Sequence, residues 1–454
     1  MSHSEPRALR FLREMRVSFV LALPLALGQL AAMLMNVVDS LLAGRHSLHT
    51  LAAVTVGSSI WTVALLACVG LMMALPPSIS QLNGANRRDA IAPLWRQSLW
   101  IAIPLGLGLA VLVHLSPWLL EAIGIVPEVR SEATGFLRAI AWGAPALALY
   151  FCLRYLSEGL AWTTPTMVSG IAALALLIPM GYALMFGIGP VHGMGATGLG
   201  IATAIVLWLQ AAGFLLYLRR TKRFADLGLF DRFERPHWPT IRGLLALGLP
   251  MGVSIFMEGS LFVATALLIG RMGAVDVAAH QVALNVASVC FMLPLGIAMA
   301  TTVRVGHAAG AGDRAAARYA VGAGFALGAL TQAAAAGLLV FGGAWIAGFY
   351  THDAAVAALA VSLMRYAAVF QLPDGIQVLS AGALRGLKDT RVPMLITILA
   401  YWGVGLPLGA WFGLHQGQRA PGLWIGLILG LAVAAILLGL RLRRQLRHAA
   451  WSAA

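Results

Sequence analysis

Three carboxylates, Asp39, Glu258 and Asp374, lie well inside long apolar stretches of this chain. A charged side chain at the centre of a bilayer costs about 2.5–3.5 kcal/mol on insertion scales, so an acid at that depth indicates a functional site. The chain has 17 acidic residues. The other acids lie at the ends of the apolar stretches, in the connections or in the terminal segments. Three deep acids in three different stretches are typical of a protein that handles cations.

The surroundings of these acids predict a proton or cation site. We expect no Lys or Arg at the same depth, with Arg365 in the outer part of its span as the one candidate. Because burial disfavours the charged form of a carboxyl group, an unpaired acid there can exchange a proton or bind Na⁺. We predict that Glu258 and Asp374 face one another across a cavity and titrate as a coupled pair, with transient Na⁺ and no structural metal. Asp39 is nearer the outer end of its span, so we expect water to reach it more easily.

Polar side chains accompany the acids at helical spacing. Gln29, Asn36 and Asp39 follow one another at spacings of seven and three residues, which puts them on one helical face. Similar stripes in the second half complete the set of residues that we expect to line a cavity: Gln29, Asn36, Ser254, Gln281, Asn285, Phe370 and Gln377. For Gln29, Ser288 and Gln377, hydrogen bonding between helices is an equally good interpretation, because polar residues hold membrane bundles together.

The surroundings of Asp374 predict an irregular helix. Phe370 and Gln377 lie one turn to either side of the acid, and Pro373 and Gly375 are its direct neighbours. Proline lacks an N–H group and disturbs the helical hydrogen bonds. We therefore expect a local break of the helix, with free carbonyl groups that coordinate a cation or a proton-linked water.

Composition predicts an all-α integral membrane protein. Hydrophobic residues make up 60% of the 454 residues and charged residues 11%, and the mean hydropathy is +0.85. A membrane-spanning helix needs about 20 mostly apolar residues. Twelve stretches meet this requirement, at 17–43, 51–75, 94–118, 133–153, 165–187, 194–217, 243–269, 277–303, 317–345, 357–382, 392–413 and 420–441.

The distribution of basic residues predicts the orientation in the membrane. Of 31 lysines and arginines, the two tails and the even-numbered connections hold 25, counted as 4, 3, 1, 7, 3, 3 and 4 along the chain. Basic residues gather on the cytoplasmic side of membrane proteins, so both termini are expected in the cytoplasm. The net charge of +14 is thereby explained without a nucleic-acid partner. The three cysteines lie in spans and are expected to pack as small apolar residues.

The chain also repeats itself. With a shift of 226 residues, Leu23-Pro24 aligns with Leu249-Pro250, and Gly44-Arg45 aligns with Gly270-Arg271. The predicted organisation is two pseudo-symmetric six-helix bundles: a tail at 1–16, a lobe at 17–217, a cytoplasmic loop at 218–242, a lobe at 243–441 and a tail at 442–454. Because six spans restore the orientation, we expect an axis along the membrane normal, a substrate site between the lobes and alternating access.

At these segments the chain resembles the multidrug and toxic compound extrusion (MATE) transporters, in their NorM-like bacterial branch. The resemblance covers the whole length and is strongest in AAHQVALNVASVCFMLPLGIAMATTVRVGHAAGAGD, VFQLPDGIQVLSAGALRGLKDTRVPM and MNVVDSLLAGR. It implies a bacterial inner-membrane antiporter, expected to be monomeric and without cofactor, that exports cationic drugs and dyes against Na⁺ or H⁺ and confers antibiotic resistance. It also implies that Asp39 is the cation-coupling acid of the first half and that Glu258 and Asp374 are those of the second half. From the easier hydration expected for Asp39, we predict that it chiefly attracts the cationic substrate or gates a proton from the outside, while ion coupling rests more on Glu258 and Asp374. Gln281 and Asn285 fall where the family lines its second-half cavity.

Two positions depart from the family pattern. Relatives often have an aromatic hydroxyl one turn before the acid of the tenth span, where this chain has Phe370. Relatives also often place Asn residues around the proline of the fifth span, where this chain has Leu177 and Gly181. A first-half ion site at Asp39 would therefore lack amide partners from that span.

Other functions remain open at this point. A lipid-linked glycan flippase shares the fold, but it tends to line its cavity with Arg or Lys, whereas the deep residues here are acidic. A membrane-embedded enzyme needs a nucleophile–base pair or a metal cluster inside the spans, and the sequence offers neither. A channel agrees less well with the repeat, which favours alternating access.

Overall fold

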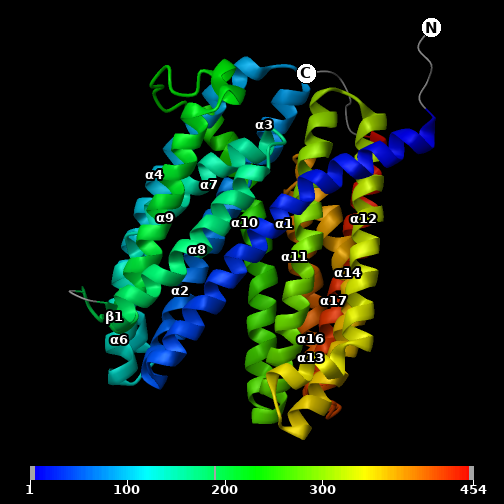
Figure 1. The fold of residues 1–454 in the computed structure, drawn as a ribbon. Coiled ribbons are helices and arrows are strands. Elements are labelled where there is room, and N and C mark those ends of the chain that lie inside the picture. Colours follow the sequence, from blue (N-terminus) through cyan, green and yellow to red (C-terminus); the bar gives the residue numbers. More distant parts are fainter. Residues whose placement is uncertain (1–5, 189–190, 449–454) are drawn as a thin grey trace. The chain divides into compact units, whose positions relative to one another are not determined.

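A computed structural model describes residues 6–188 and 191–448 of the chain (Figure 1). In this part, eleven helices are long and apolar enough to cross a membrane. The helices α6 and α7 together pass the same test and meet at an angle of 44°, so counting this pair as one span gives twelve. The predicted all-α membrane fold with twelve spans is confirmed. The one sheet in the described residues is the two-stranded antiparallel pair β1–β2.

The helices of the first half have short connections. They are α1 (Arg7–His46), α2 (Leu48–Met72), α3 (Leu75–Gly84), η1 (Arg88–Ala90), α4 (Ile91–Leu115), α5 (Pro117–Ala122), α6 (Pro127–Ala141), α7 (Ala144–Gly159), α8 (Thr164–Phe186) and α9 (Gly195–Arg220). The strands β1 (Gly187–Ile188) and β2 (Val191–His192) join α8 to α9, and the 3₁₀ helix η2 (Lys222–Leu227) follows α9.

The helices of the second half are longer on average. They are α10 (Trp238–Gly270), α11 (Ala274–Gly310), α12 (Arg314–Phe341), α13 (Gly343–Tyr350), α14 (Ala354–Gly386), α15 (Arg391–Ile398), η3 (Leu399–Gly405), α16 (Leu406–Ala410), η4 (Trp411–His415) and α17 (Arg419–His448). The segments η3 and η4 are π-helical. The predicted span at 392–413 is therefore a helix with two π-helical segments.

The helix bounds reproduce the repeat seen in the sequence. Ala274, which begins α11, lies 226 residues after Leu48, which begins α2. Gly310, which ends α11, lies 226 residues after Gly84, which ends α3. The same shift relates η1 and α4, over 88–115, to α12, over 314–341. α11 thus corresponds to α2 and α3 together, and α12 corresponds to η1 and α4 together, as expected for an internal repeat.

The chain forms two compact units. The C-terminal unit contains residues 1–26, 84–86 and 253–454, and the N-terminal unit contains residues 27–83 and 87–252. The units thus cross the predicted boundary at 218–242, because α1 passes from one unit to the other after Ala26 and α10 does so after Gly252. These two positions are related by the 226-residue shift, and each lies two residues after its proline, Pro24 or Pro250. The predicted lobes and their symmetry axis remain a prediction.

Residues 7–16 of the predicted N-terminal tail are helical. α1 begins at Arg7, ten residues before the expected start of the first span. Within the C-terminal unit, Glu14 accepts two hydrogen bonds from Arg304, both of 2.7 Å. This bidentate pair explains why a polar segment continues the helix beyond the apolar span.

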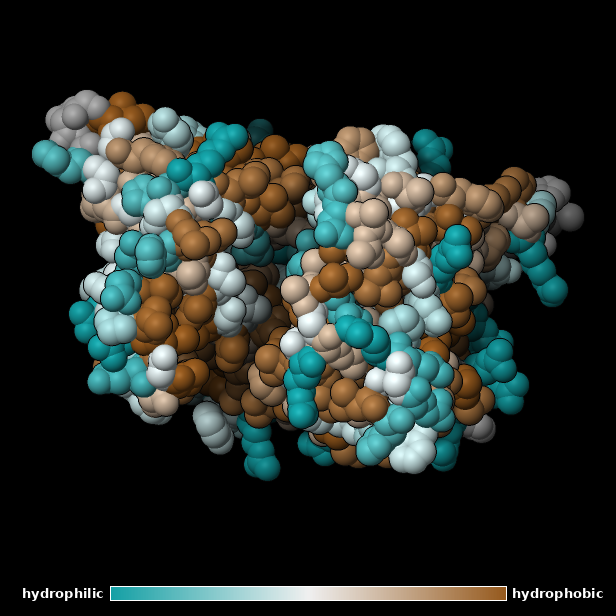
Figure 2. Space-filling view, turned by 90° about the horizontal axis from the view of Figure 1, so that it is seen from below, coloured by the Kyte–Doolittle hydropathy of each residue, from teal (hydrophilic) through white to brown (hydrophobic). Residues whose placement is uncertain are grey.

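Each unit has its own apolar core and a largely apolar surface. Trp95 is a large buried side chain of the N-terminal unit, and Trp424 and Tyr401 are large buried side chains of the C-terminal unit. Hydrophobic side chains also cover much of the face shown in Figure 2, and Leu267 is 70% exposed. An exposed apolar surface of this kind is expected where lipid replaces water as the solvent.

Candidate cation and proton sites

The two acids of the second half lie together in the C-terminal unit. Glu258 is on α10 and Asp374 is on α14. Asp374 is only 3% exposed, Glu258 is half-buried, and the two carboxyl groups interact as like charges. Burial and mutual repulsion both disfavour two negative charges here, so the pair favours a shared proton or a bound cation.

The phenol group of Tyr401 lies near this acid pair. Tyr401, from the π-helical segment η3, interacts electrostatically with both Glu258 and Asp374 and lies beside Gln377. In the described residues, the hydroxyl oxygen of Tyr401 and Oε1 of Gln377 are buried without a hydrogen-bond partner of good geometry. Sequence reasoning missed Tyr401. Its only signal is a phenol in an otherwise apolar span. A π-helical segment often marks a functional site.

The basic residue near the acid pair is not the one expected. Arg385, in the last turn of α14, interacts electrostatically with Glu258. The prediction that no Lys or Arg lies at the depth of these acids, with Arg365 as the one candidate, stays a prediction, because Arg385 acts on Glu258 from the end of its helix. Arg365 has an exposed side chain. Arg385 lies at the end of an apolar span, and its long side chain can reach inward from there.

The helix around Asp374 is not broken. α14 runs from Ala354 to Gly386 through Pro373 without interruption, so the predicted break is wrong. Gln332 of α12 donates a hydrogen bond of 2.7 Å to the carbonyl oxygen of Gln371. A neighbouring side chain thus binds to the backbone beside the proline, which is how membrane helices accommodate proline.

The remaining predicted residues of the second half lie in three settings. Phe370 is 6% exposed and packs edge-on against Phe262 and Trp424 at centroid distances of 6.2 and 6.0 Å, so it belongs to the apolar core. Gln281 is exposed and donates a hydrogen bond of 3.0 Å to Asn285. Ser254 is half-buried on α10, one turn before Glu258.

Asp39 is in the N-terminal unit and is buried. Its side chain is 7% exposed, and its Oδ1 atom has no hydrogen-bond partner in the part of the chain described. The expectation that Asp39 is the most hydrated of the three acids is therefore wrong, since Glu258 is more exposed. Asn36, on the same helix, is exposed.

Another buried acid, on α7, was missed by sequence reasoning. Glu158, at the end of α7, is 1% exposed and accepts a hydrogen bond of 2.5 Å from Nε of Arg154, which is 5% exposed. Gln29 of α1 accepts a bond of 3.2 Å from the same guanidinium group. Thr166 of α8 donates a bond of 3.0 Å to Glu158. Gln29 is thus a helix-to-helix contact, and this acid is neutralised within its own unit.

Carboxyl groups in such surroundings can bind a proton or a monovalent cation. Over residues 6–188 and 191–448, no three His, Cys, Asp or Glu side chains form a group that could hold a metal ion. The acid pair offers carboxylate, amide and phenol oxygens, the ligands that hard cations prefer. A proton can bind to the same carboxyl groups.

Comparisons with known proteins identify the family of the chain. The family model MatE matches residues 24–183 and 250–411, one match in each half. A probable multidrug resistance protein NorM of Xanthomonas campestris is 52% identical, and the match covers 98% of each chain. The multidrug resistance protein PmpM of Pseudomonas aeruginosa is 43% identical over 97% of this chain and 94% of that protein.

Solved structures share the fold. An outward-facing multidrug resistance MATE transporter of the MOP superfamily superposes with a TM-score of 0.89 at 18% identity, over 98% of this chain and 99% of that one. The eukaryotic MATE transporter AtDTX14 gives 0.85 at 21% identity, over 96% and 98%. The chain therefore belongs to the MatE family of membrane transporters, in its NorM-like bacterial branch, and is not an enzyme.

Proposed function

We propose that this protein exports drugs, chiefly organic cations and dyes, in exchange for Na⁺ or H⁺ that enters down its gradient. Export of drugs is supported by the relatives, which are named multidrug resistance proteins. The observation that carries ion coupling is the pair formed by Glu258 and Asp374. Two carboxyl groups that interact as like charges in a buried site cannot both be charged without a compensating cation.

Exchange follows from competition for this negative charge. A proton or Na⁺ at the pair removes the repulsion between the carboxyl groups, with the oxygens of Gln377 and Tyr401 as further ligands for Na⁺. A cationic drug is attracted only while the negative charge is free. Two ligands that exclude each other in this way couple their gradients, because each shifts the population of states available to the other.

Asp39 adds a second negative site in the N-terminal unit. Its unpartnered Oδ1 atom is buried, so a proton or a cation is needed to balance the carboxylate. The proposal assigns Asp39 mainly to attraction of the cationic substrate. We further propose a monomer in the bacterial inner membrane, with both termini in the cytoplasm and transport by alternating access.

Dye export measured under separately collapsed gradients tests the proposal. Cells or everted vesicles that contain the protein are loaded with a cationic dye, and either the pH gradient or the Na⁺ gradient is removed. We expect export to stop when one of the two is removed and to continue when the other is removed. Export that persists after both gradients are collapsed would overturn ion coupling. Equal export of neutral and cationic dyes would overturn the substrate class.

A further inference from the structure

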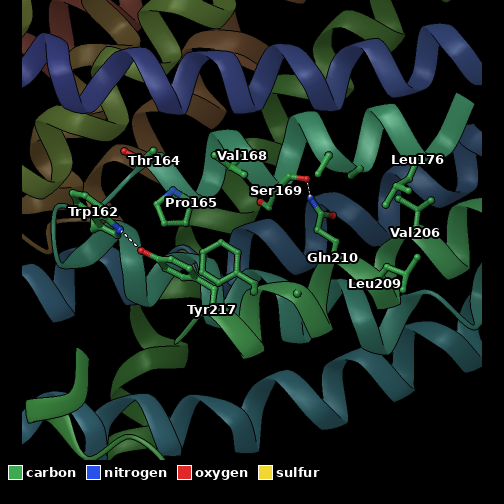
Figure 3. Close-up of a pocket in the computed structure, with 14 residues that line it drawn as sticks. Trp162, Thr164, Pro165, Val168, Ser169, Leu176, Val206, Leu209, Gln210 and Tyr217 are labelled. Carbon is green, nitrogen blue, oxygen red and sulfur yellow. Dashed lines mark hydrogen bonds between the residues drawn. The ribbon is translucent and has the colours of Figure 1, made fainter. Parts of the chain in front are cut away.

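A cavity of about 480 Å³ lies between α8 and α9 in the N-terminal unit (Figure 3). Its walls are mostly apolar, with Val168 and Leu176 from α8 facing Val206 and Leu209 from α9. Val168 is 56% exposed and Leu209 is 48% exposed, so the cavity is a groove open to the surface of this unit. None of the acids described above lines it.

Polar groups in the wall of the groove are largely bound within the protein. Gln210 donates a hydrogen bond of 3.3 Å to the carbonyl oxygen of Ser169, as the dashed line in Figure 3 shows. The hydroxyl of Ser169 donates to the carbonyl oxygen of Thr166 at 3.1 Å. The middle of the groove therefore suits a hydrocarbon chain better than a hydrogen-bonding drug.

One end of the groove has an aromatic pair. The indole N–H of Trp162 donates a hydrogen bond of 2.6 Å to the hydroxyl oxygen of Tyr217 (Figure 3). Among the described residues, no acceptor is seen for the hydroxyl proton of Tyr217. This proton is available to an ester or phosphate oxygen of a ligand. Trp and Tyr are enriched at the boundary between lipid tails and head groups.

The same end carries positive charge. The guanidinium group of Arg223 stacks over the Trp162 ring at 4.0 Å, and Arg220 ends α9 one turn after Tyr217. Both arginines are exposed, as is Lys222 between them. In contrast to Arg88 and Arg96 of the same unit, which form ion pairs with Asp226 and Glu234, these three have no carboxylate partner in the described structure.

We propose that this groove is a binding site for an anionic membrane phospholipid. One acyl chain lies between α8 and α9, and the phosphate lies near Arg220, Lys222 and Arg223, within reach of the Tyr217 hydroxyl. Clusters of basic residues beside a membrane helix recognise anionic head groups. The positive charge at the groove's end disfavours a cationic drug, and an uncharged or zwitterionic lipid would leave it unbalanced.

Lipid binding to the full-length protein tests the site. The purified protein is titrated with phosphatidylglycerol or with phosphatidylcholine of the same acyl chains, and bound lipid is counted by native mass spectrometry. We expect phosphatidylglycerol to bind at least about tenfold more tightly, since each basic residue near the surface contributes roughly a fivefold preference. Equal affinity for the two lipids would overturn the proposal, as would displacement of bound phosphatidylglycerol by a cationic dye.

Two variants with matched controls locate the lipid. Arg220→Gln with Arg223→Gln should reduce phosphatidylglycerol affinity by more than about tenfold, with no effect on phosphatidylcholine. The control changes two other exposed arginines, Arg232→Gln with Arg242→Gln, and should leave both affinities as in the wild type. A loss of phosphatidylglycerol affinity of the same size in the control would overturn the assigned position of the phosphate.

A second substitution tests the place of the acyl chain. Gly213 lines the groove, and a Cβ atom there would meet open space, so Gly213→Phe can fill the groove without disturbing the helix. Gly108 on α4 has equally open surroundings and is outside the groove, so Gly108→Phe is its control. We expect Gly213→Phe to abolish lipid retention and Gly108→Phe to retain it, with similar thermal unfolding of both. Equal retention in the two variants would overturn the site.

Discussion

Arg154 and Glu158, one turn apart on α7, form an ion pair of 2.5 Å that is almost completely buried. Gln29 of α1 and Thr166 of α8 bind to its two members. Three helices of the N-terminal unit are thus held by one charged cluster. The two charges balance each other, so this pair differs from the Glu258–Asp374 pair, whose charges repel.

We expect loss of either member of this pair to destabilise the protein strongly. Arg154→Met leaves a buried carboxylate without its partner, which typically costs about 3–5 kcal/mol of the free energy of unfolding. The double variant Arg154→Met with Glu158→Leu removes both charges and should recover most of the loss. Thermal unfolding in detergent measures both. If the double variant is less stable than Arg154→Met, the neutralising role assigned to Arg154 is wrong.

The ion pair between Arg88 and Asp226 is exposed, in contrast to the buried pair of Arg154 and Glu158. Its Nε–Oδ2 distance is 2.8 Å, but the two side chains are 40% and 54% exposed. The hydrogen bond from Arg88 lowers the pKa of Asp226 below its usual value of 3.8. A lowered carboxyl pKa stabilises the folded state above the unfolded pKa, and this contribution is lost as the pH falls through the folded pKa.

We therefore expect Asp226→Asn to reduce the free energy of unfolding by less than about 1 kcal/mol at pH 7, because water and salt screen an exposed pair. The difference from the wild type should vanish in strong acid, below the lowered pKa of Asp226 in the folded protein. It should also shrink in 1 M salt at pH 7. Thermal unfolding at several pH values measures it. A loss at neutral pH as large as that of Arg154→Met would contradict the assignment.

Neutral variants of the acid pair should separate transport from folding. Glu258→Gln or Asp374→Asn should reduce gradient-driven dye export to the background rate, because neither amide can exchange a proton. The free energy of unfolding should stay the same or rise, since a buried repulsion is removed. The control is Asp353→Asn, which changes an exposed capping acid on the same helix α14 to another good capping residue. Export at the wild-type rate by either neutral variant would remove the pair from the coupling step.

Asp39 should behave differently from the pair. It is buried like Asp374, but it lies in the other unit and no second carboxyl group is paired with it in the described residues. We expect Asp39→Asn to weaken the apparent affinity for cationic dyes by roughly tenfold, the scale of one lost charge interaction, and to change ion dependence much less. Dye binding and gradient-driven export are measured on the same preparation. Normal dye binding with export abolished would reverse the roles assigned to the two units.

The helices could be predicted from the sequence because a spanning helix depends mainly on its own composition. The repeat was also visible, since Pro24 and Pro250 lie at equivalent positions of two helices. The exact ends of the helices could not be predicted, because they depend on contacts between residues that are far apart in the chain. The start of α1 at Arg7, for example, depends on the bond between Glu14 and Arg304, which are 290 residues apart.

The acids of the site could be predicted, but not their partners. Glu258 and Asp374 stand out because a deep carboxylate is rare. Arg385 lies in the last turn of α14, and Tyr401 lies in the π-helical segment η3. The direction of a side chain at such positions depends on packing and cannot be deduced from the sequence pattern. Glu158 falls in the predicted connection after the stretch 133–153, but it is next to the last residue of α7. Its burial depends on Gln29, which lies far away in the chain.

The packing of α11 against α14 gives a last prediction. Gly382 of α14 lies where an added Cβ atom would be 2.6 Å from the carbonyl oxygen of Ala298 on α11, and Thr302 donates a hydrogen bond of 2.8 Å to the Gly382 carbonyl. Such small residues let membrane helices approach closely. We expect Gly382→Ala to cost about 1–3 kcal/mol of the free energy of unfolding, the usual penalty for overpacking.

Gly337 on α12 is the matched control, because an added Cβ atom there would meet nothing within 4 Å. Gly337→Ala should stabilise the protein by up to about 1 kcal/mol, since alanine is the better helix former. The same substitution therefore has opposite signs at the two positions, which separates close packing from helix propensity. Thermal unfolding of both variants in the same detergent measures the two effects. Stabilisation at both positions would show that α11 and α14 can move apart without cost.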